Sequence, residues 1–427
     1  MPIGAVQAEV LIVGAGPAGL LLAGDLAADG ICVLVLERER GGSLTPGEVM
    51  LHARALEQLD VRGIADRLVD AGRAITRLDV GPASLTLAQL PSRFQFALVT
   101  AQHELRGLLS ARATSLGARI LPGVQVSGLR QDSAGTQVLA TERGRPARSY
   151  AAPYLVGADG ADSTVRTALG LPLLRLPGGW RQVPRLASGR VLLAGEAAHT
   201  DPEPGTGGPG LEAGLHDAAN LGWKLAAVLR GTAGSALLGS YHDERGYAVR
   251  RMARMCHALA PRWPRSLLGE AAAILLAGSL ADRAARAVAG LSLAYPAGPG
   301  SHRLAGRRMP DVSLAEVPPS EAVPLAGGGP WRLHEALGER RPVLLVDAAA
   351  LASTDLAALL ALWPGRLTVA APAAPTGPAR VVLVRPDGYV AWATDTRAPT
   401  RRYAGLRQAL NRWCGPPAAG RRMALPS

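Results

Sequence analysis

Residues 8–40 contain two short apolar runs on either side of a helical stretch. Residues 9–13 (EVLIV) and 32–36 (CVLVL) each have the length and composition of a buried strand. The stretch between them begins with the glycine spacing GxGxxG, and an acidic residue follows the second run. This order predicts a strand–turn–helix–strand unit of a doubly wound α/β fold.

Each glycine of this turn has a separate task. Gly14 permits a tight turn, Gly16 leaves room for a pyrophosphate against the backbone, and Gly19 lets the helix pack closely on the strand. The start of the helix offers unpaired N–H groups and the positive end of its dipole to phosphates. Glu37 follows the second strand, where it can accept hydrogen bonds from a ribose. The unit therefore predicts a dinucleotide site, and by itself it leaves NAD and FAD as alternatives.

Two later segments repeat the pattern of an apolar strand followed by a glycine-containing turn. Residues 154–166 (YLVGADGADSTVR) predict a strand, a turn with Asp159, and a helix that starts near Asp162. Residues 189–231 predict another strand, a Gly-Glu pair, a loop rich in glycine and proline, and a helix from about Leu211. Such a loop lets backbone approach a flat, electron-rich ring closely.

Taken together, these segments resemble the class A flavoprotein monooxygenases, the p-hydroxybenzoate hydroxylase family, and most closely its bacterial hydroxylases of aromatic polyketides. The resemblance extends over nearly the whole chain, because residues 51–68 and 91–113 look like the connecting helices of the family, and residues 291–296 and 302–314 mark the exit from its FAD domain. It implies a Rossmann-like domain that binds FAD, NAD(P)H as co-substrate, and a small aromatic or polyketide substrate. The residues implied for the FAD site are Gly14, Gly16, Pro17, Ala18, Gly19, Glu37, Arg38, Gln102, Val126, Asp159, Gly195, Glu196, Pro202, Gly207, Gly208, Gly210, Leu211 and Glu212. No catalytic residue and no metal ligand is assigned.

The C-terminal part predicts a separate small α/β domain. Residues 330–427 alternate strand-like runs with helical stretches and end in a helix over residues 403–413. The segment resembles the thioredoxin-like tail of such hydroxylases, but it has no CxxC, so we expect a structural or dimer-forming role and no thiol chemistry. We expect an FAD-binding domain at residues 1–298 and this domain at 299–427.

One connection is much shorter than the family resemblance implies. Only residues 167–188 join the two later segments, where the family has a whole antiparallel sheet over the reacting edge of the flavin. We expect a remnant of that sheet within residues 73–100, as a strand pair between 75 and 90, and two strands make a poor independent sheet. A truncated middle sheet should favour peroxide release over hydroxylation. The alternative is a non-hydroxylating accessory or interaction protein of a polyketide pathway.

Individual positions also differ from the family. Glu196 stands in place of an aspartate, Gly47 falls where relatives often carry a cofactor-facing arginine, and Glu212 replaces an asparagine beside the pyrimidine ring of the flavin. A carboxylate at that place opposes the negative charge of reduced flavin. We expect a lower flavin potential or weaker binding unless Glu212 turns to solvent or is protonated. Trp180, in the short linker, either covers the flavin or plugs the gap.

Four polar residues near these turns have simpler interpretations. We interpret His199 as a structural loop histidine rather than a catalytic acid–base. Asp217 and Asn220 are explained by capping or packing, and Ser163 by the start of a helix, because no base that could activate it is identifiable.

Composition excludes several classes of function. The 427 residues are 48% hydrophobic, which suffices for two or three domains, and 4% aromatic, which argues against stacked-base recognition. The net charge of +12 comes almost entirely from arginines spread along the chain, which favours a basic surface that attracts phosphorylated cofactors over a nucleic-acid surface. Three distant cysteines predict neither a disulfide framework nor a zinc site. The apolar stretch 271–280 is too short to cross a bilayer and no signal peptide is evident, so we expect a cytoplasmic protein. The sequence leaves open whether it acts alone, as a homo-oligomer or with a pathway partner.

Overall fold

The computed structural model describes residues 8–40, 47–80, 83–142, 145–202, 208–259, 279–315, 332–347, 353–374 and 379–418. Two compact units make up the chain. The first comprises Met1–Leu229 and Leu238–Leu293, and the second comprises Arg230–Leu237 and Ala294–Ser427. Most of the apolar stretch 271–280 lies outside the described residues.

A six-stranded sheet, in the order β15-β16-β12-β1-β2-β8, forms the centre of the first unit. Its five strands from β16 to β8 are parallel, and β15 pairs antiparallel at one edge. The strands are β1 (Val10–Val13), β2 (Val33–Glu37), β8 (Arg119–Pro122), β12 (Tyr154–Gly157), β15 (Ala187–Ser188) and β16 (Val191–Leu193). The chain runs outward from β1 through β2 to β8, then returns to β12 on the other side of β1 and continues to β16, which confirms the doubly wound α/β fold.

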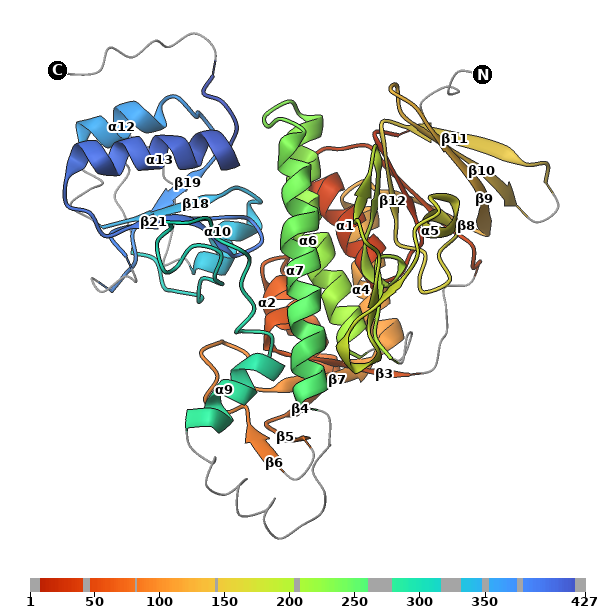
Figure 1. Cartoon of the computed structure of the whole chain (residues 1–427), viewed down its shortest axis with the longest axis horizontal. Helices are drawn as coiled ribbons and strands as arrows, with labels where there is room; N and C mark the ends of the chain where they lie inside the picture. The colour runs from red at the N-terminus through yellow and green to blue at the C-terminus, as the bar shows by residue number, and fades with distance from the viewer. Residues whose placement is uncertain are drawn as a thin grey trace. The chain divides into compact units, whose positions relative to one another are not determined.

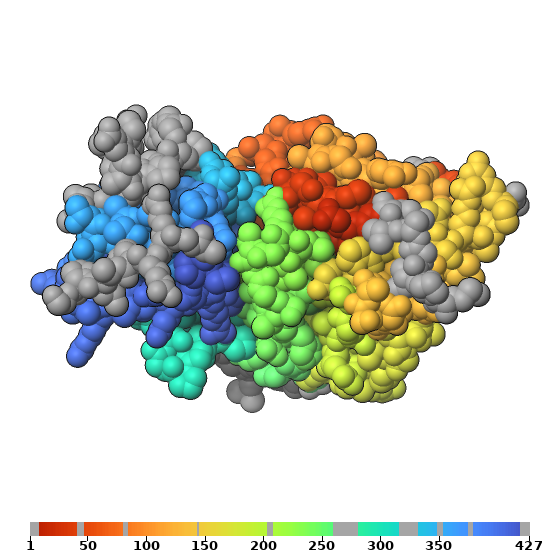
Figure 2. Space-filling view, turned by 90° about the horizontal axis from the view of Figure 1, so that it is seen from above, coloured from red at the N-terminus to blue at the C-terminus, as the bar shows by residue number. Residues whose placement is uncertain are grey.

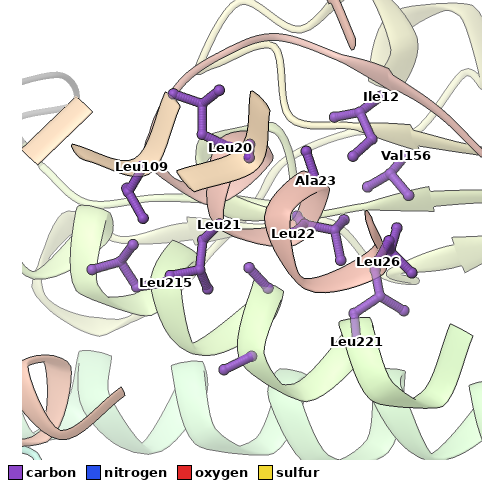
Figure 3. Packing of buried hydrophobic residues seen from close by; sticks show 14 of the residues in the cluster. Ile12, Leu20, Leu21, Leu22, Ala23, Leu26, Leu109, Val156, Leu215 and Leu221 are labelled. Carbon is purple, nitrogen blue, oxygen red and sulfur yellow. The ribbon is translucent and has the colours of Figure 1, made fainter. Parts of the chain in front are cut away.

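Helix α1 (Pro17–Ala28) is buried along most of its length because other elements cover it on several sides. It packs against α4 (Gln102–Ser115) and α6 (Pro209–Leu229). Leu21 lies beside Leu215 of α6, and Ala23 faces Ile12 and Val156 of the sheet (Figure 3). Each leucine buried in this way contributes about 1.5–3 kcal/mol, so the leucine-rich helix anchors the glycine-rich turn that precedes it.

The region between β2 and β12 contains smaller sheets. One is the antiparallel sheet of β9 (Val124–Gln131), β10 (Thr136–Glu142) and β11 (Arg148–Ala152), which projects from one end of the unit in Figure 1 and, in yellow, in Figure 2. Another is formed by β3 (Glu48–Leu51), β7 (Ala97–Ala101) and β4 (Arg73–Ile75). The stretch 91–113, expected to resemble a connecting helix, contains β7 and then the greater part of α4, which begins at Gln102. The stretch 51–68 does hold α2 (Ala53–Asp60) and the start of α3 (Ala65–Ala71).

The expected strand pair is a hairpin of β5 (Arg77–Val80) and β6 (Ala83–Thr86), which among the described residues forms a two-stranded sheet of its own. The short linker after α5 (Thr164–Ala168) forms β13 (Leu174–Arg175), the 3-10 turn η1 (Pro177–Gly179) and β14 (Arg181–Gln182). Strand β14 pairs with β13 on one side and with β17 (His199–Thr200) on the other. The linker and β17 thus form a three-stranded sheet of very short strands. Two further helices complete the described part of this unit. They are α7 (Ala236–Leu259), whose first two residues belong to the second unit, and α9 (Ser279–Val288).

A four-stranded mixed sheet in the order β19-β18-β20-β21 forms the second unit. β18 is parallel to β19 and antiparallel to β20. The strands are β18 (Val343–Val346), β19 (Thr368–Ala370), β20 (Val381–Val384) and β21 (Val390–Thr394), and the helices are α10 (Leu333–Gly338), α12 (Thr354–Leu360) and α13 (Pro399–Trp413). Buried Arg385 lies over the rings of both Tyr295 and Trp413, at 5.0 and 4.9 Å. The small C-terminal α/β domain is therefore present as expected. No helix in the described part of the chain is long and apolar enough to span a bilayer.

Candidate functional site

A cleft opens at the carboxyl ends of β1, β2, β12 and β16, which is where doubly wound sheets bind ligands. Most of the sequence-predicted site residues line it: Gly14, Gly16, Pro17, Ala18, Glu37, Arg38, Gln102, Val126, Asp159, Gly195, Glu196, Gly210 and Leu211. These residues come from segments far apart in the sequence, and the fold brings them around one space.

The remaining predicted residues lie elsewhere. Gly19 is buried behind the turn, and Gly208 immediately precedes α6 without lining the cleft. Pro202 is exposed near the linker, where a Cβ on Gly179 would be 3.3 Å from its Cγ. Glu212 contacts His52, as described below. Gly207 lies outside the described residues.

The first turn has the shape that a pyrophosphate needs. Gly14 has φ +104°, and a Cβ there would lie 2.3 Å from the carbonyl oxygen of Ala158. A Cβ on Gly19 would lie 2.2 Å from the oxygen of Gly14, so both glycines are required by close backbone packing. At Gly16, in contrast, a Cβ would meet no atom within 4 Å. That open space beside the N-terminus of α1 fits a diphosphate bound to backbone N–H groups.

Three elements meet at the other end of the cleft. A Cβ on Gly214 of α6 would lie 3.1 Å from Cα of Gly195, in the 3-10 turn η2 (Gly195–Ala197), and 3.2 Å from Cβ of Ala18 in α1. Only small residues allow this approach. The three turns that the sequence singled out therefore converge, since their residues line one cleft.

Glu37 occupies the place where a ribose is bound in this fold. Its Oε2 accepts a hydrogen bond of 2.6 Å from the N–H of Ala15, and its Oε1 accepts one of 3.0 Å from the N–H of Glu39. A carboxylate has about four lone-pair sites, so both oxygens can still accept bonds from ribose hydroxyls.

Arg106 also lines the cleft, and the sequence analysis did not identify it. Its Nε donates a hydrogen bond of 3.0 Å to the carbonyl oxygen of Ala15. Its terminal nitrogens lie 3.9 Å from the carboxylates of Glu37 and Glu39. The only local signal is that Arg106 follows Gln102 by one helical turn on α4.

Asp159 borders the cleft but directs its carboxylate to the start of α5. Its Oδ1 accepts a bond of 2.5 Å from the hydroxyl of Ser163, and its Oδ2 accepts one of 3.2 Å from the N–H of Val165. Burial raises the pKa of Asp159, although these bonds act in the opposite direction. Ser163 in turn accepts a bond from the N–H of Arg166, which confirms that it caps a helix.

Asp217 is buried and accepts hydrogen bonds from three residues, whereas the sequence indicated only capping or packing. Its Oδ2 accepts bonds from the N–H of Gly195 and from Nε2 of His199, at 2.9 and 2.6 Å, and its Oδ1 accepts one from Nε of Arg245 at 2.7 Å. Burial would raise the pKa of Asp217, but the charges and hydrogen bonds of His199 and Arg245 lower it to about 2. Asp217 thus fixes the turn at Gly195, and His199 has the structural role expected of it.

Glu212 neither turns to solvent nor faces the cleft. It is 7% exposed, and its Oε1 accepts a bond of 2.5 Å from the backbone N–H of His52 and lies 3.2 Å from Nδ1 of the same residue. Burial alone would lower the pKa of His52, but the charge and hydrogen bond of Glu212 outweigh it, and the pKa is raised. The carboxylate therefore has a hydrogen-bonding partner whose protonated form it stabilises, and no sequence motif marks that partner.

The linker fills space beside α6. Trp180 is 1% exposed and packs with Ala213, Val249, Met252 and Ala253. The ring is enclosed between the first turn of α6 and the body of α7. Trp180 therefore plugs the gap left by the short connection.

Comparison with known proteins agrees with this geometry. The FAD binding domain family matches residues 7–183 and 175–255, and the C-terminal domain family of aromatic-ring hydroxylases matches residues 302–417. The first match comes in two pieces that meet within the short linker, as expected if part of the family domain is missing there.

Relatives and solved structures extend the match over the whole chain. A 12-dehydrotetracycline 5-monooxygenase/anhydrotetracycline 6-monooxygenase of Streptomyces rimosus is 29% identical over 96% of this chain and 99% of its own. A dialkyldecalin synthase of Streptomyces rugosporus is 31% identical over 96% and 99%. The structure of the OxyS anhydrotetracycline hydroxylase from Streptomyces rimosus superposes with a TM-score of 0.82, at 29% identity over 96% of this chain and 100% of that one.

These alignments also show a difference in size. The alignment to the tetracycline enzyme runs over 522 positions, more than the 427 residues of this chain, so the relative contains residues that this chain lacks. The cleft, the family matches and the relatives agree on one assignment. The chain belongs to the FAD-binding aromatic-ring hydroxylases, the class A flavoprotein monooxygenases.

Proposed function

We propose that this protein binds FAD in the cleft described above and uses NAD(P)H to oxidise a planar aromatic, polyketide-like substrate. The observation that carries the proposal is the convergence of the turns at Gly16, Asp159 and Gly195 on one cleft. Bound FAD supplies the redox chemistry, passing electrons from NAD(P)H to oxygen.

The protein's own residues bind and orient the cofactor. Gly14, Gly16 and the start of α1 receive the diphosphate, Glu37 the adenosine ribose, and the turn at Gly195 with the start of α6 the flavin half. Asp217 holds the Gly195 N–H in place from behind. The positive end of α6 faces the ligand and stabilises negative charge on it.

We further propose that the flavin end of the site is less shielded than in longer relatives. The strands in the connection between β12 and β16 are very short, and the β5–β6 hairpin pairs with no other strand in the part of the chain that the structure describes. Because exclusion of water and closure over the substrate keep such a reaction productive, we expect much of the NAD(P)H consumption to end in hydrogen peroxide.

A second candidate is a protein that keeps FAD but does not hydroxylate. The short connection favours it, and so does the resemblance to a relative named as a dialkyldecalin synthase rather than as a monooxygenase. In this case FAD would shape the site, and the product would be an isomer of the substrate or the substrate would be passed to a partner.

One set of measurements separates these functions. The purified protein is titrated with FAD and then incubated with NADPH, oxygen and a panel of aromatic polyketides. A product 16 mass units heavier supports hydroxylation, peroxide in proportion to NADPH supports the unshielded site, and FAD binding without NADPH consumption supports the second candidate. A protein that takes up no FAD would contradict both.

The compartment and the partners remain predictions. Cys32, Cys256 and Cys414 are all free thiols, which supports the proposed cytoplasmic location. A homo-oligomer or a pathway partner could be detected by light scattering during the FAD titration.

A further inference from the structure

Arg106 stands between the glycine-rich turn and two acidic residues at the adenosine end of the cleft. Its Nε is bonded to the carbonyl oxygen of Ala15, which lies between Gly14 and Gly16. This bond fixes the plane of the guanidinium beside the space that Gly16 leaves open.

The terminal nitrogens of Arg106 are available for a ligand. Their carboxylate neighbours, Glu37 and Glu39, lie at 3.9 Å, which is longer than a hydrogen bond. The side chain is 16% exposed, so its charge is partly desolvated and more effective than that of a surface arginine. A guanidinium held in this way presents paired N–H groups that match the oxygens of a phosphate.

The acidic residues of the cleft lining also favour a cationic partner for a diphosphate. Glu37 and Glu39 would both repel a diphosphate, and Arg38 is the other arginine that lines the cleft. We propose that Arg106 is a binding residue for the diphosphate of FAD, held ready by Ala15 and offsetting the acidic pair. This inference rests on the proposed FAD site and adds to it a residue that recognises the phosphorylated half of the cofactor.

The alternative role for Arg106 is purely structural, as a brace for the turn at Ala15. The two roles differ in which ligands they affect. A phosphate-binding residue matters for FAD and ADP but not for riboflavin, which has no phosphate. A brace that shapes the whole cleft would affect all three.

The experiment compares Arg106→Gln and Arg106→Lys with the control Arg119→Gln, which removes the same charge from an exposed position on β8. Affinities of the full-length apoprotein for FAD, ADP and riboflavin are measured by fluorescence and calorimetry. We expect Arg106→Gln to weaken FAD and ADP by about 10- to 100-fold, as for loss of charged hydrogen bonds, and riboflavin by less than about twofold. Arg106→Lys should fall between, because it keeps the charge but not the paired donors.

Two results would overturn the inference. One is an Arg106→Gln protein that binds FAD and ADP as tightly as the Arg119→Gln control. The other is a loss of riboflavin affinity as large as the loss of FAD affinity. If the unmodified protein binds no FAD at all, the proposed function fails instead, so the two failures are distinguishable.

Discussion

The carboxylate of Asp217 lies 2.6 Å from Nε2 of His199, and both side chains are completely buried. The same carboxylate holds the N–H of Gly195, whose φ of +63° places the turn at the edge of the cleft. Arg245 supplies a third donor from α7. A single buried charge therefore links two helices to the turn at Gly195, which lines the cleft.

Replacing Asp217 with asparagine should strongly destabilise the protein. The substitution removes the carboxylate that pairs with the buried guanidinium of Arg245 at 2.7 Å, and breaking a buried pair in this way costs about 3–5 kcal/mol. The free energy of unfolding is measured by urea titration. Asp243→Asn, at an exposed position of α7, is the control and should change it by less than about 0.5 kcal/mol. Equal free energies of unfolding for the two variants would show that the hydrogen bonds of Asp217 do not stabilise the fold.

The depressed pKa of Asp217 also predicts how acid acts on this protein. The pKa is about 2 in the folded state, against 3.8 for the free side chain. The stabilisation is therefore complete above pH 3.8 and is lost as the pH falls toward 2, amounting to about 2 kcal/mol. Stability measured between pH 5 and pH 2 should fall more steeply in the unmodified protein than in Asp217→Asn. If the free energy of unfolding fell equally with pH in the two proteins, the lowered pKa of Asp217 would be contradicted.

Two glycines of the same turn should respond differently to alanine. At Gly16 a Cβ meets no atom within 4 Å, so Gly16→Ala should keep its stability but occupy the space of the diphosphate and weaken FAD binding. At Gly19 a Cβ would lie 2.2 Å from the oxygen of Gly14, so Gly19→Ala should destabilise the apoprotein itself. Thermal unfolding without FAD, followed by FAD titration, separates the effects. If Gly16→Ala bound FAD as tightly as the unmodified protein, this space would not be the diphosphate site.

The pairing of Glu212 with His52 can be tested through the histidine. Glu212 raises the pKa of His52, so this pair stabilises the fold below the free histidine value of 6.5, and the stabilisation is lost as the pH rises through the folded pKa. In Glu212→Gln the pKa of His52 should fall, because burial then acts with little opposition. NMR titration of the histidine ring protons measures it. Glu104→Gln, beside exposed His103, is the control and should leave the His52 resonance unchanged.

The parts of the site that could be predicted from sequence are those set by local backbone chemistry. Gly14, Gly16 and Gly19 are required by one turn within one βαβ unit, so their spacing suffices to identify it. Asp217 and Arg106 could not be identified in this way, because their partners come from other elements and no short motif marks them. Glu212 shows the limit most clearly. Its charge was predicted to oppose reduced flavin, but its partner His52 comes from a segment 160 residues away.

Trp180 fills a pocket formed by α6 and α7, so Trp180→Ala should lower the free energy of unfolding by about 3–5 kcal/mol through the lost burial and the cavity left behind. Because the ring packs on the helices rather than on the ligand, the loss should be the same with and without FAD. Trp180→Phe, which refills most of the space, should recover much of it. If Trp180→Ala instead kept its stability while peroxide release from NADPH oxidation rose, the ring would be a cover for the flavin and not a plug.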